Sequence, residues 1–245
     1  MIWQPLIDEL AEWRAAGLAP SLWLRDDDAV EPTPLLDRLV TLTAKRKIPL
    51  VLAVIPAKTD ERLAAHLRSI EHVHPCVHGW AHANHAPPGE KKQELGGHRE
   101  KSEVLVELTR GFARLRELHG ERLLPLLVPP WNRVSPDIVA ELPQLGFAAF
   151  STFGHKPLPH PSGLAIVNCH VDLIDWKNGA RCRDYGQLIA ELAGELKRSR
   201  LSDQAPVGVL SHHLVSTDDV FAFLEGLFAA TRGSAHWVVP QGFRA

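Results

Sequence analysis

Disulfide-forming cysteine patterns, long apolar runs and an excess of charge of either sign are all missing from this 245-residue sequence. Its three cysteines are odd in number and lack CxxC spacing, which argues against a disulfide framework and against a zinc knuckle. No apolar stretch approaches the ~18 residues needed to span a bilayer. With 27 basic and 29 acidic residues the formal net charge is -2, so nucleic acid and anionic membrane are not expected partners.

The N-terminal segment also lacks a basic region followed by an apolar core, which is the pattern of a secretory signal peptide. We therefore expect a soluble, cytoplasmic protein. Histidine, in contrast, is abundant: the chain has 14, and several of them are clustered. This raises the expectation of a metal site or an acid–base site.

Short apolar runs alternate with amphipathic segments of helical period along the whole chain. The continuous apolar run 49–55 is typical of a strand buried on both faces of a parallel sheet. Strands are also predicted at 22–24, 73–77, 123–128, 147–151, 165–169, 207–210 and 236–239, and helices at 5–16, 33–46, 60–70, 99–119, 136–145, 184–198 and 217–231. Right-handed crossovers favour closure of such a sheet into a barrel. No linker divides the chain, so we expect one α/β domain over residues 1–245.

Residues of metal-ligand and catalytic type follow five of the predicted strands. Ligands bind outside the carboxyl ends of strands in sheets wound from βα units, so these clusters are expected to converge on one site. The clusters are Asp26-Asp27-Asp28, His78 with His82, Pro130-Trp131, Asp172 with Asp175-Trp176, and His212.

The two histidines of the second cluster are four residues apart. On a helical turn this spacing puts both imidazoles of His78 and His82 on one face, where they can share a metal ion. Such a spacing also arises by chance in a histidine-rich chain. The three acids of the first cluster repel one another, and a cation together with Arg25 would offset that cost. A helix cap or a solvated turn is the alternative interpretation of these acids.

The remaining clusters have equally simple alternatives. Trp131, on a rigid proline turn, offers a flat face for a sugar ring, or it packs under a loop. Asp172 and Asp175 could orient an acidic histidine, or cap a helix. The strand predicted at 207–210 is followed by two imidazoles, His212 and His213, and one of them is well placed as a general acid. The segment 83–97, which follows the histidine pair, is a candidate lid.

In this order the clusters resemble the motifs of the polysaccharide deacetylase family, the NodB-homology or carbohydrate esterase group. That family has an Asp-Asp pair, then HxxxH, an RxPW-type segment, DxxDW and LxH. The segments HGWAH at 78–82 and DLIDW at 172–176 are the specific matches. The resemblance covers residues 22–213 and implies a divergent member with a distorted (β/α)7-type barrel.

The resemblance also implies roles for these residues. Asp28, His78 and His82 would bind a divalent metal, most often zinc, and Asp27 would be the general base. His212 would protonate the leaving amine, kept cationic by Asp172 or Asp175, and a backbone N–H near Trp131 would stabilise the oxyanion. Trp176 completes the fourth motif.

Two departures from the family pattern concern the catalytic base. Val128 stands where the third motif begins with an arginine, and Arg25 or Arg133 could replace that arginine. The first motif has three acids and lacks the usual glycine. We favour Asp27 as base and Asp28 as ligand, and the other register would move these roles to Asp26 and Asp27.

These features predict a metal-dependent hydrolase of C–N bonds that removes an acyl group from an N-acylated amino sugar. The substrate would be a small molecule or an oligosaccharide. A cyclic amide or imide, or another amide that is not a sugar, is an alternative substrate on the same fold. A catalytically silent carbohydrate-binding member is the alternative from another class. A metal-storage or structural zinc protein is a third idea, but it would have four closed ligands, whereas three candidates leave an open position as catalytic sites do.

Overall fold

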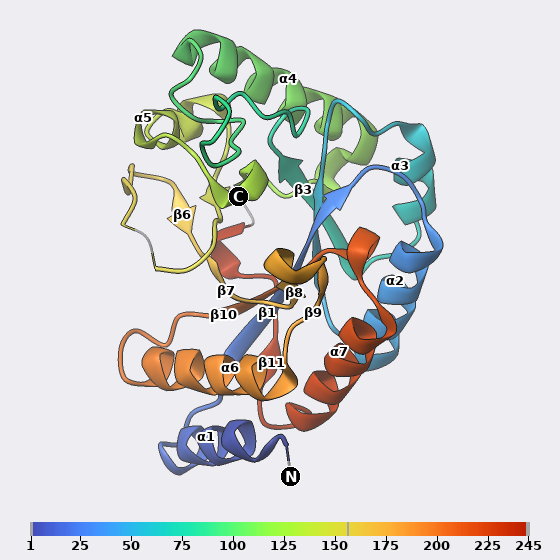
Figure 1. The fold of residues 1–245 in the computed structure, drawn as a ribbon, viewed down its shortest axis with the longest axis vertical. Helices are drawn as coiled ribbons and strands as arrows, with labels where there is room; N and C mark the ends of the chain where they lie inside the picture. The colour runs from blue at the N-terminus through green and yellow to red at the C-terminus, as the bar shows by residue number, and fades with distance from the viewer. Residues whose placement is uncertain (1, 156, 244–245) are drawn as a thin grey trace. The chain divides into compact units, whose positions relative to one another are not determined.

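The computed structural model describes residues 2–155 and 157–243, and strands alternate with helices along this chain (Figure 1). The strands are β1 (Ser21–Ala29), β2 (Leu50–Val54), β3 (Val73–His78), β4 (Leu126–Val128), β5 (Ala149–Phe150), β6 (Ala165–Ile166), β7 (Cys169–Asp172), β8 (Ile174–Asp175), β9 (Arg181–Cys182), β10 (Val207–Ser211) and β11 (His236–Trp237). The helices are α1 (Gln4–Ala15), α2 (Pro34–Arg46), α3 (Glu61–Leu67), α4 (Lys101–His119), α5 (Pro136–Val139), α6 (Tyr185–Arg200) and α7 (Asp218–Ala230).

Nine of the strands form one sheet in the order β6-β5-β4-β3-β2-β1-β10-β7, with β11 also paired to β1. The pairs of β1 with β10 and β11, of β10 with β7, and along β3-β4-β5-β6 are parallel. The strands β8 and β9 form a separate antiparallel pair. A parallel sheet whose strands are linked through helices has the topology of a distorted (β/α)7-type barrel, which confirms the predicted fold class.

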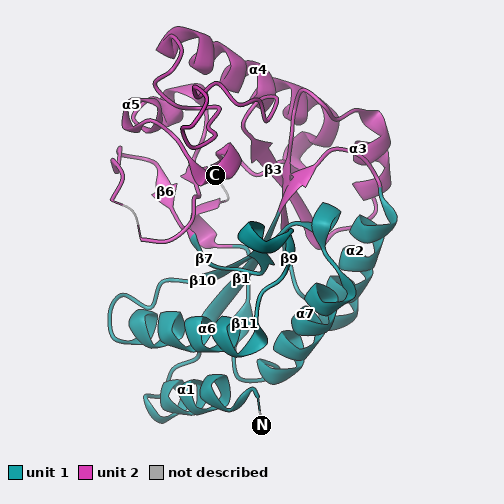
Figure 2. Cartoon of the chain, in the orientation of Figure 1, with its two compact units in different colours: residues 1–26, 33–50, 169–239 teal, residues 27–32, 51–168, 240–245 magenta. Residues whose placement is uncertain are grey.

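The chain divides into two compact units, each made of segments that are far apart in the sequence (Figure 2). Unit 1 comprises residues 1–26, 33–50 and 169–239, and unit 2 comprises residues 27–32, 51–168 and 240–245. Both β1 and β2 pass from one unit into the other. Within unit 2 the end of β1 is joined to the chain after β2, since Ile55 N donates to Ala29 O at 3.0 Å. The single domain expected over 1–245 stays a prediction.

Burial of apolar side chains explains the strands and helices that were predicted most clearly. All five residues of β2 are 0% exposed, as expected for a strand covered on both faces. In unit 1, α1 lies against α6 (Figure 1), and the indole of Trp13 is buried and donates from Nε1 to Leu196 O at 3.2 Å. Each large apolar side chain buried in this way contributes roughly 1.5–3 kcal/mol to stability.

The strand predicted at 165–169 is wrong, because two strands share this stretch. Residues of β6 pair with β5, whereas β7 pairs with β10. The break between them falls at Asn168, whose side chain accepts from Thr152 N at 2.8 Å and donates to Gly154 O at 2.9 Å. An asparagine that bonds to neighbouring backbone in this way competes with the strand ladder.

Two other predicted elements differ in extent. The strand predicted at 22–24 continues to Ala29, so the three acids lie within β1 rather than after it. The helix predicted at 136–145 is divided into α5 and a 3-10 turn at Leu142–Leu145. Pro143 within that turn has no N–H to donate, which disfavours a continuous helix.

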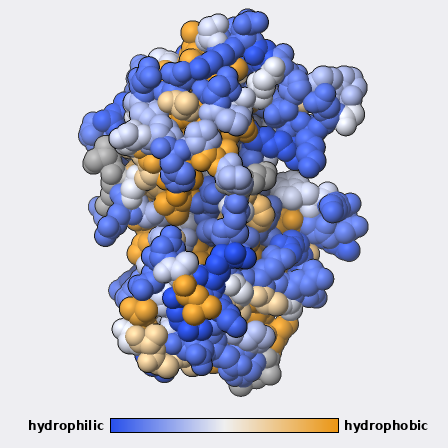
Figure 3. All heavy atoms as spheres, turned by 90° about the vertical axis from the view of Figure 1, so that its left-hand side faces the viewer, coloured by the Kyte–Doolittle hydropathy of each residue, from blue (hydrophilic) through white to orange (hydrophobic). Residues whose placement is uncertain are grey.

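Within the described residues, no helix combines the length and the apolar character that crossing a membrane requires. The face drawn in Figure 3 is mainly hydrophilic, with apolar groups scattered among polar ones. Among the exposed large apolar side chains are Val106 and Leu201. Single exposed apolar residues of this kind are normal on protein surfaces.

His119, at the end of α4, makes stability depend on pH. Burial and the nearby Arg122 lower its pKa to about 4, and its Nε2 is buried without a hydrogen-bond partner among the described residues. In the unfolded chain the pKa of histidine is about 6.5, so protons bind preferentially to the unfolded state between these values. We expect the free energy of unfolding to fall as pH drops through this window, by roughly 1–3 kcal/mol from this residue.

Urea unfolding at pH 7.5 and pH 4.5 measures this contribution. His119→Gln should lose less stability over the interval than the wild type, and the same substitution at exposed His160 should leave the loss unchanged. An identical loss of stability in the His119 variant and the wild type would show that the imidazole of His119 is not its cause.

Candidate metal centre

Three side chains predicted as metal ligands lie together in unit 2. The candidate ligand atoms of Asp28, His78 and His82 all lie within 4.8 Å of one another. Both Nε2 atoms face the same carboxylate oxygen: His78 Nε2 is 3.1 Å and His82 Nε2 is 3.2 Å from Asp28 Oδ1. Two imidazoles and one carboxylate form a donor set that suits zinc and related divalent ions.

His78 is oriented by the strand beside it. It is the last residue of β3, is 1% exposed, and pairs with Val128 at the end of β4. Its Nδ1 lies 3.0 Å from Val128 O. A carbonyl can only accept, so Nδ1 carries the proton and the lone pair of Nε2 is directed at the ligand cluster. This is the arrangement that metal-binding histidines use to fix ring and tautomer.

His82 reaches the cluster without a helix, so the predicted helical turn is wrong. The residues after β3 are irregular, and the backbone is left-handed at Gly79 (φ 59°) and at His82 (φ 52°). These two residues reverse the chain within five positions and return the second imidazole to the first. The ring centroids of His78 and His82 are 5.3 Å apart.

Glu94 holds the turn that carries His82, and sequence reasoning missed it. Its side chain is fully buried and accepts from Trp80 N at 3.0 Å, Ala81 N at 2.8 Å and Ala83 N at 3.1 Å. The one available signal is Gly79, directly after the first histidine. A Cβ there would lie 2.1 Å from Glu94 Oε2, so only glycine leaves room for this carboxylate.

The electrostatics of His82 suit metal binding. Burial lowers its pKa, and the nearby Asp28 carboxylate opposes the shift by favouring the charged form. The lowered pKa keeps the imidazole neutral, and the neutral form is the one that donates a lone pair to a metal.

Backbone strain is concentrated around these ligands. Seven non-glycine residues of the described chain have positive φ, and four of them are Asp28 (74°), His82 (52°), Trp131 (55°) and Asn132 (55°). Each costs of order 1–3 kcal/mol and persists only where surrounding structure enforces it. The Trp131 ring lies 4.2 Å from the His82 ring, centroid to centroid. Strain of this kind is typical of functional sites.

The three consecutive acids have different surroundings. Asp28 faces the two histidines, and Asp27 is 2% exposed on β1. Asp26 bonds within unit 1: its carboxylate accepts from Ser211 Oγ at 2.7 Å, from His213 N at 2.9 Å, and from the imidazole Nδ1 of His213. Of the two imidazoles that follow β10, His213 is therefore the one bound to Asp26.

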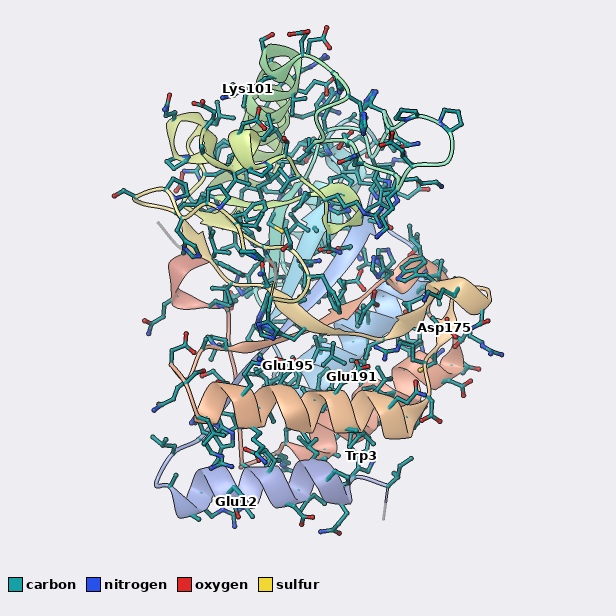
Figure 4. All side chains as sticks on the ribbon, turned by 60° about the vertical axis from the view of Figure 1, so that its left-hand side comes forward. Trp3, Glu12, Lys101, Asp175, Glu191 and Glu195 are labelled. Atoms are coloured by element: carbon teal, nitrogen blue, oxygen red, sulfur yellow. The ribbon has the colours of Figure 1, made fainter. Side chains whose placement is uncertain are left out.

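The fourth and fifth motifs belong to unit 1 and form a cluster there. The Trp176 ring stands edge-on to His212 with 4.7 Å between centroids, and its Nε1 donates to Asp172 Oδ2 at 2.9 Å. Asp175, labelled in Figure 4, caps the turn after β8 by accepting from Lys177 N and Asn178 N, each at 3.2 Å.

The two arginines proposed to replace the missing one differ in their surroundings. Arg25 on β1 is 0% exposed. Arg133 in unit 2 is half-buried, and its Nη1 donates to Lys92 O at 2.7 Å. The guanidinium of Arg133 therefore binds the segment after His82.

No family model and no curated protein matches this chain. Solved structures match its fold. A CE4 esterase from Streptococcus mutans has a TM-score of 0.60 at 11% identity, over 93% of this chain and 88% of that one. A family 4 acetyl xylan esterase from Clostridium thermocellum, in complex with a cobalt ion, has a TM-score of 0.50 at 13% identity, over 87% and 85%. A CE4 family pseudoenzyme from Bacillus anthracis has a TM-score of 0.56 at 13% identity, over 89% and 62%. The chain therefore has the fold of these carbohydrate esterases.

Replacing either histidine should abolish the metal binding predicted for this centre. His78→Ala or His82→Ala leaves two of three ligands, and we expect metal content to fall from about one divalent ion per chain to near zero. Elemental analysis of protein purified without a His-tag or chelator measures this. His85→Ala, in the same segment but outside the ligand cluster, is the matched control and should keep the ion. Unchanged metal in both ligand variants would place any bound ion elsewhere.

Proposed function

We propose that the protein is a metal-dependent hydrolase of C–N bonds that removes an acyl group from an N-acylated amino sugar. The observation that carries the proposal is the convergence of Asp28, His78 and His82 in unit 2. Asp28 directly follows the buried Asp27 on β1. Three ligands leave a coordination position open, as catalytic zinc sites do. Zinc is the ion we propose, and the cytoplasm is the compartment we propose.

The fit between the residues and a metal rests on their chemistry. Three groups are ready to donate to a divalent ion: the Asp28 carboxylate, the His78 imidazole, whose tautomer is set by Val128 O, and the His82 imidazole, whose pKa is lowered. A bound divalent ion would supply Lewis acidity, which polarises an acyl carbonyl and acidifies water.

The chain's own residues would then move the protons. Asp27 would accept a proton from the attacking water, and His212 would give a proton to the departing amine as the C–N bond breaks. Trp176, edge-on to His212 and held by Asp172, would restrict the imidazole. The environment of Asp26 supports Asp27 as the base, because the Asp26 carboxylate is engaged by Ser211 and His213.

Arg25 is our candidate for the role of the missing arginine. Side chains two residues apart on a strand lie on the same face, so Arg25 and Asp27 share a face of β1. Complete burial of its guanidinium supports a role beside a carboxylate, since buried charges are paired.

A catalytically silent carbohydrate-binding protein is the second candidate. Val128 in place of the third-motif arginine favours it. The two candidates differ in turnover, whereas both allow metal binding. Cyclic amides and imides should be tested in the same assay, because a metal site with an open position, a general base and a general acid would also support their hydrolysis.

The variant Asp27→Asn tests whether Asp27 acts as the general base or as a metal ligand. The amide cannot accept the proton from water, so we expect hydrolysis of N-acetylated amino-sugar oligomers to fall by about 10²–10⁴-fold with metal content unchanged. Released acetate and bound metal are measured on the same preparation. Asp28→Asn is the matched control and should lose the metal. Loss of metal in the Asp27 variant instead would move the ligand role to Asp27, and absence of turnover by the wild type on all these amides would favour the silent candidate.

A further inference from the structure

Glu94 is a fully buried carboxylate that binds the backbone around His82. It comes from the segment 83–97, after the exposed stretch 87–92, and accepts three hydrogen bonds from the turn between residues 80 and 83. Oε1 accepts from Ala81 N and Ala83 N, and Oε2 accepts from Trp80 N. The accepted N–H groups therefore lie on both sides of the candidate ligand.

The position of Glu94 is itself firmly determined. Next to it, Leu95 is fully buried and forms a parallel bridge with Val134, and Ser135 N donates to Leu95 O at 2.8 Å. A Cβ at Gly79 would meet both Glu94 Oε2, at 2.1 Å, and the ring of Pro130, at 2.6 Å. Gly79 is thus flanked by the Glu94 carboxylate and by the segment that carries Trp131.

The turn needs this support because of its backbone. His82 is a non-glycine residue at φ 52°, a conformation that L-residues adopt only when neighbouring structure imposes it. Bonds to residues 80, 81 and 83 impose it from both sides. Without them, a regular backbone at His82 would direct its imidazole away from Asp28 and His78.

We propose that Glu94 is a positioning residue that holds His82 as a metal ligand and so sets the affinity of the centre. The inference rests on the metal centre of the proposed function. It assigns part of the segment 83–97 to the metal site: its inner end, Glu94 to Gly96, is buried and braces the ligand turn.

The chemistry of the site requires a carboxylate. Three N–H groups need acceptor lone pairs, and the two oxygens of Glu94 provide them. Glutamine has one acceptor oxygen and an NH₂ group that only donates. In Glu94→Gln the NH₂ would face at least one backbone N–H, so that bond is lost and the turn is free to relax.

The experiment compares zinc affinity, by competition with a chromophoric chelator, in the wild type, Glu94→Gln and a control. Loss of an outer support typically weakens metal binding 10–100-fold, and we expect this range for Glu94→Gln. The cobalt-loaded variant should also show an altered visible spectrum, because the geometry of His82 changes. Glu9→Gln, which removes a buried carboxylate from its pair with Arg200 on α6, is the matched control and should keep wild-type affinity.

Thermal unfolding distinguishes positioning from simple structural support. A structural role lowers the melting temperature of the metal-free and zinc-loaded protein equally. A positioning role reduces the rise in melting temperature that zinc produces, because that rise follows affinity. Should Glu94→Gln fail to fold by circular dichroism, Glu94→Asp replaces it: the shorter acid reaches fewer of the N–H groups, and its zinc affinity should still fall below wild type.

The outcomes separate the two proposals. Zinc binding by the wild type with equal affinity in the folded Glu94 variant would overturn the role of Glu94 and leave the metal centre standing. A wild type that binds neither zinc nor cobalt would overturn both. Weaker zinc binding and a changed cobalt spectrum in the Glu94 variant alone would support both.

Discussion

Asp28 and His82 meet through backbone that ordinary residues avoid, with φ of 74° and 52°. Regular strand geometry would send consecutive side chains to opposite faces. Asp28, near the end of β1, has a left-handed backbone that turns its carboxylate toward the histidine at the end of β3. His82, after β3, has a left-handed backbone that brings its imidazole back to that of His78. The candidate centre therefore depends on strain that its surroundings must hold. Gly79 makes room for that support and Glu94 provides it.

The acidic triplet shows how one strand can separate three identical side chains. Burying three adjacent carboxylates is costly unless each has compensation. Asp26 receives hydrogen bonds from Ser211 and His213 in unit 1, and Asp28 faces two imidazoles in unit 2. Asp27, the residue between them, is buried on the same strand. The three side chains are chemically identical, and their partners and the left-handed backbone at Asp28 separate them.

Local signals made the fold and the ligand types predictable. The continuous apolar run of β2 and the HxxxH spacing are properties of consecutive residues, and both point to the features found. The division of 165–169 between β6 and β7 was not predictable, because it depends on the bonds of Asn168 to a distant segment. Glu94 was missed for the same reason: a carboxylate that serves backbone N–H groups follows no spacing rule. The prediction of a helical turn for the two histidines was wrong, because a four-residue spacing does not distinguish a helix from a chain reversal that begins at a glycine.

The substitution at the third motif separates ligand geometry from catalysis. Val128 orients His78 through its backbone carbonyl, a function that any residue could perform at that position. The valine side chain therefore has no part in orienting His78, and the candidate ligands do not require an arginine at this position. What an arginine would add there is positive charge, so the proposed base needs a cation from elsewhere in the chain. Arg25, buried two residues earlier on the same strand, is the cation proposed for this role, and its charge would favour the ionised form of a neighbouring carboxylate.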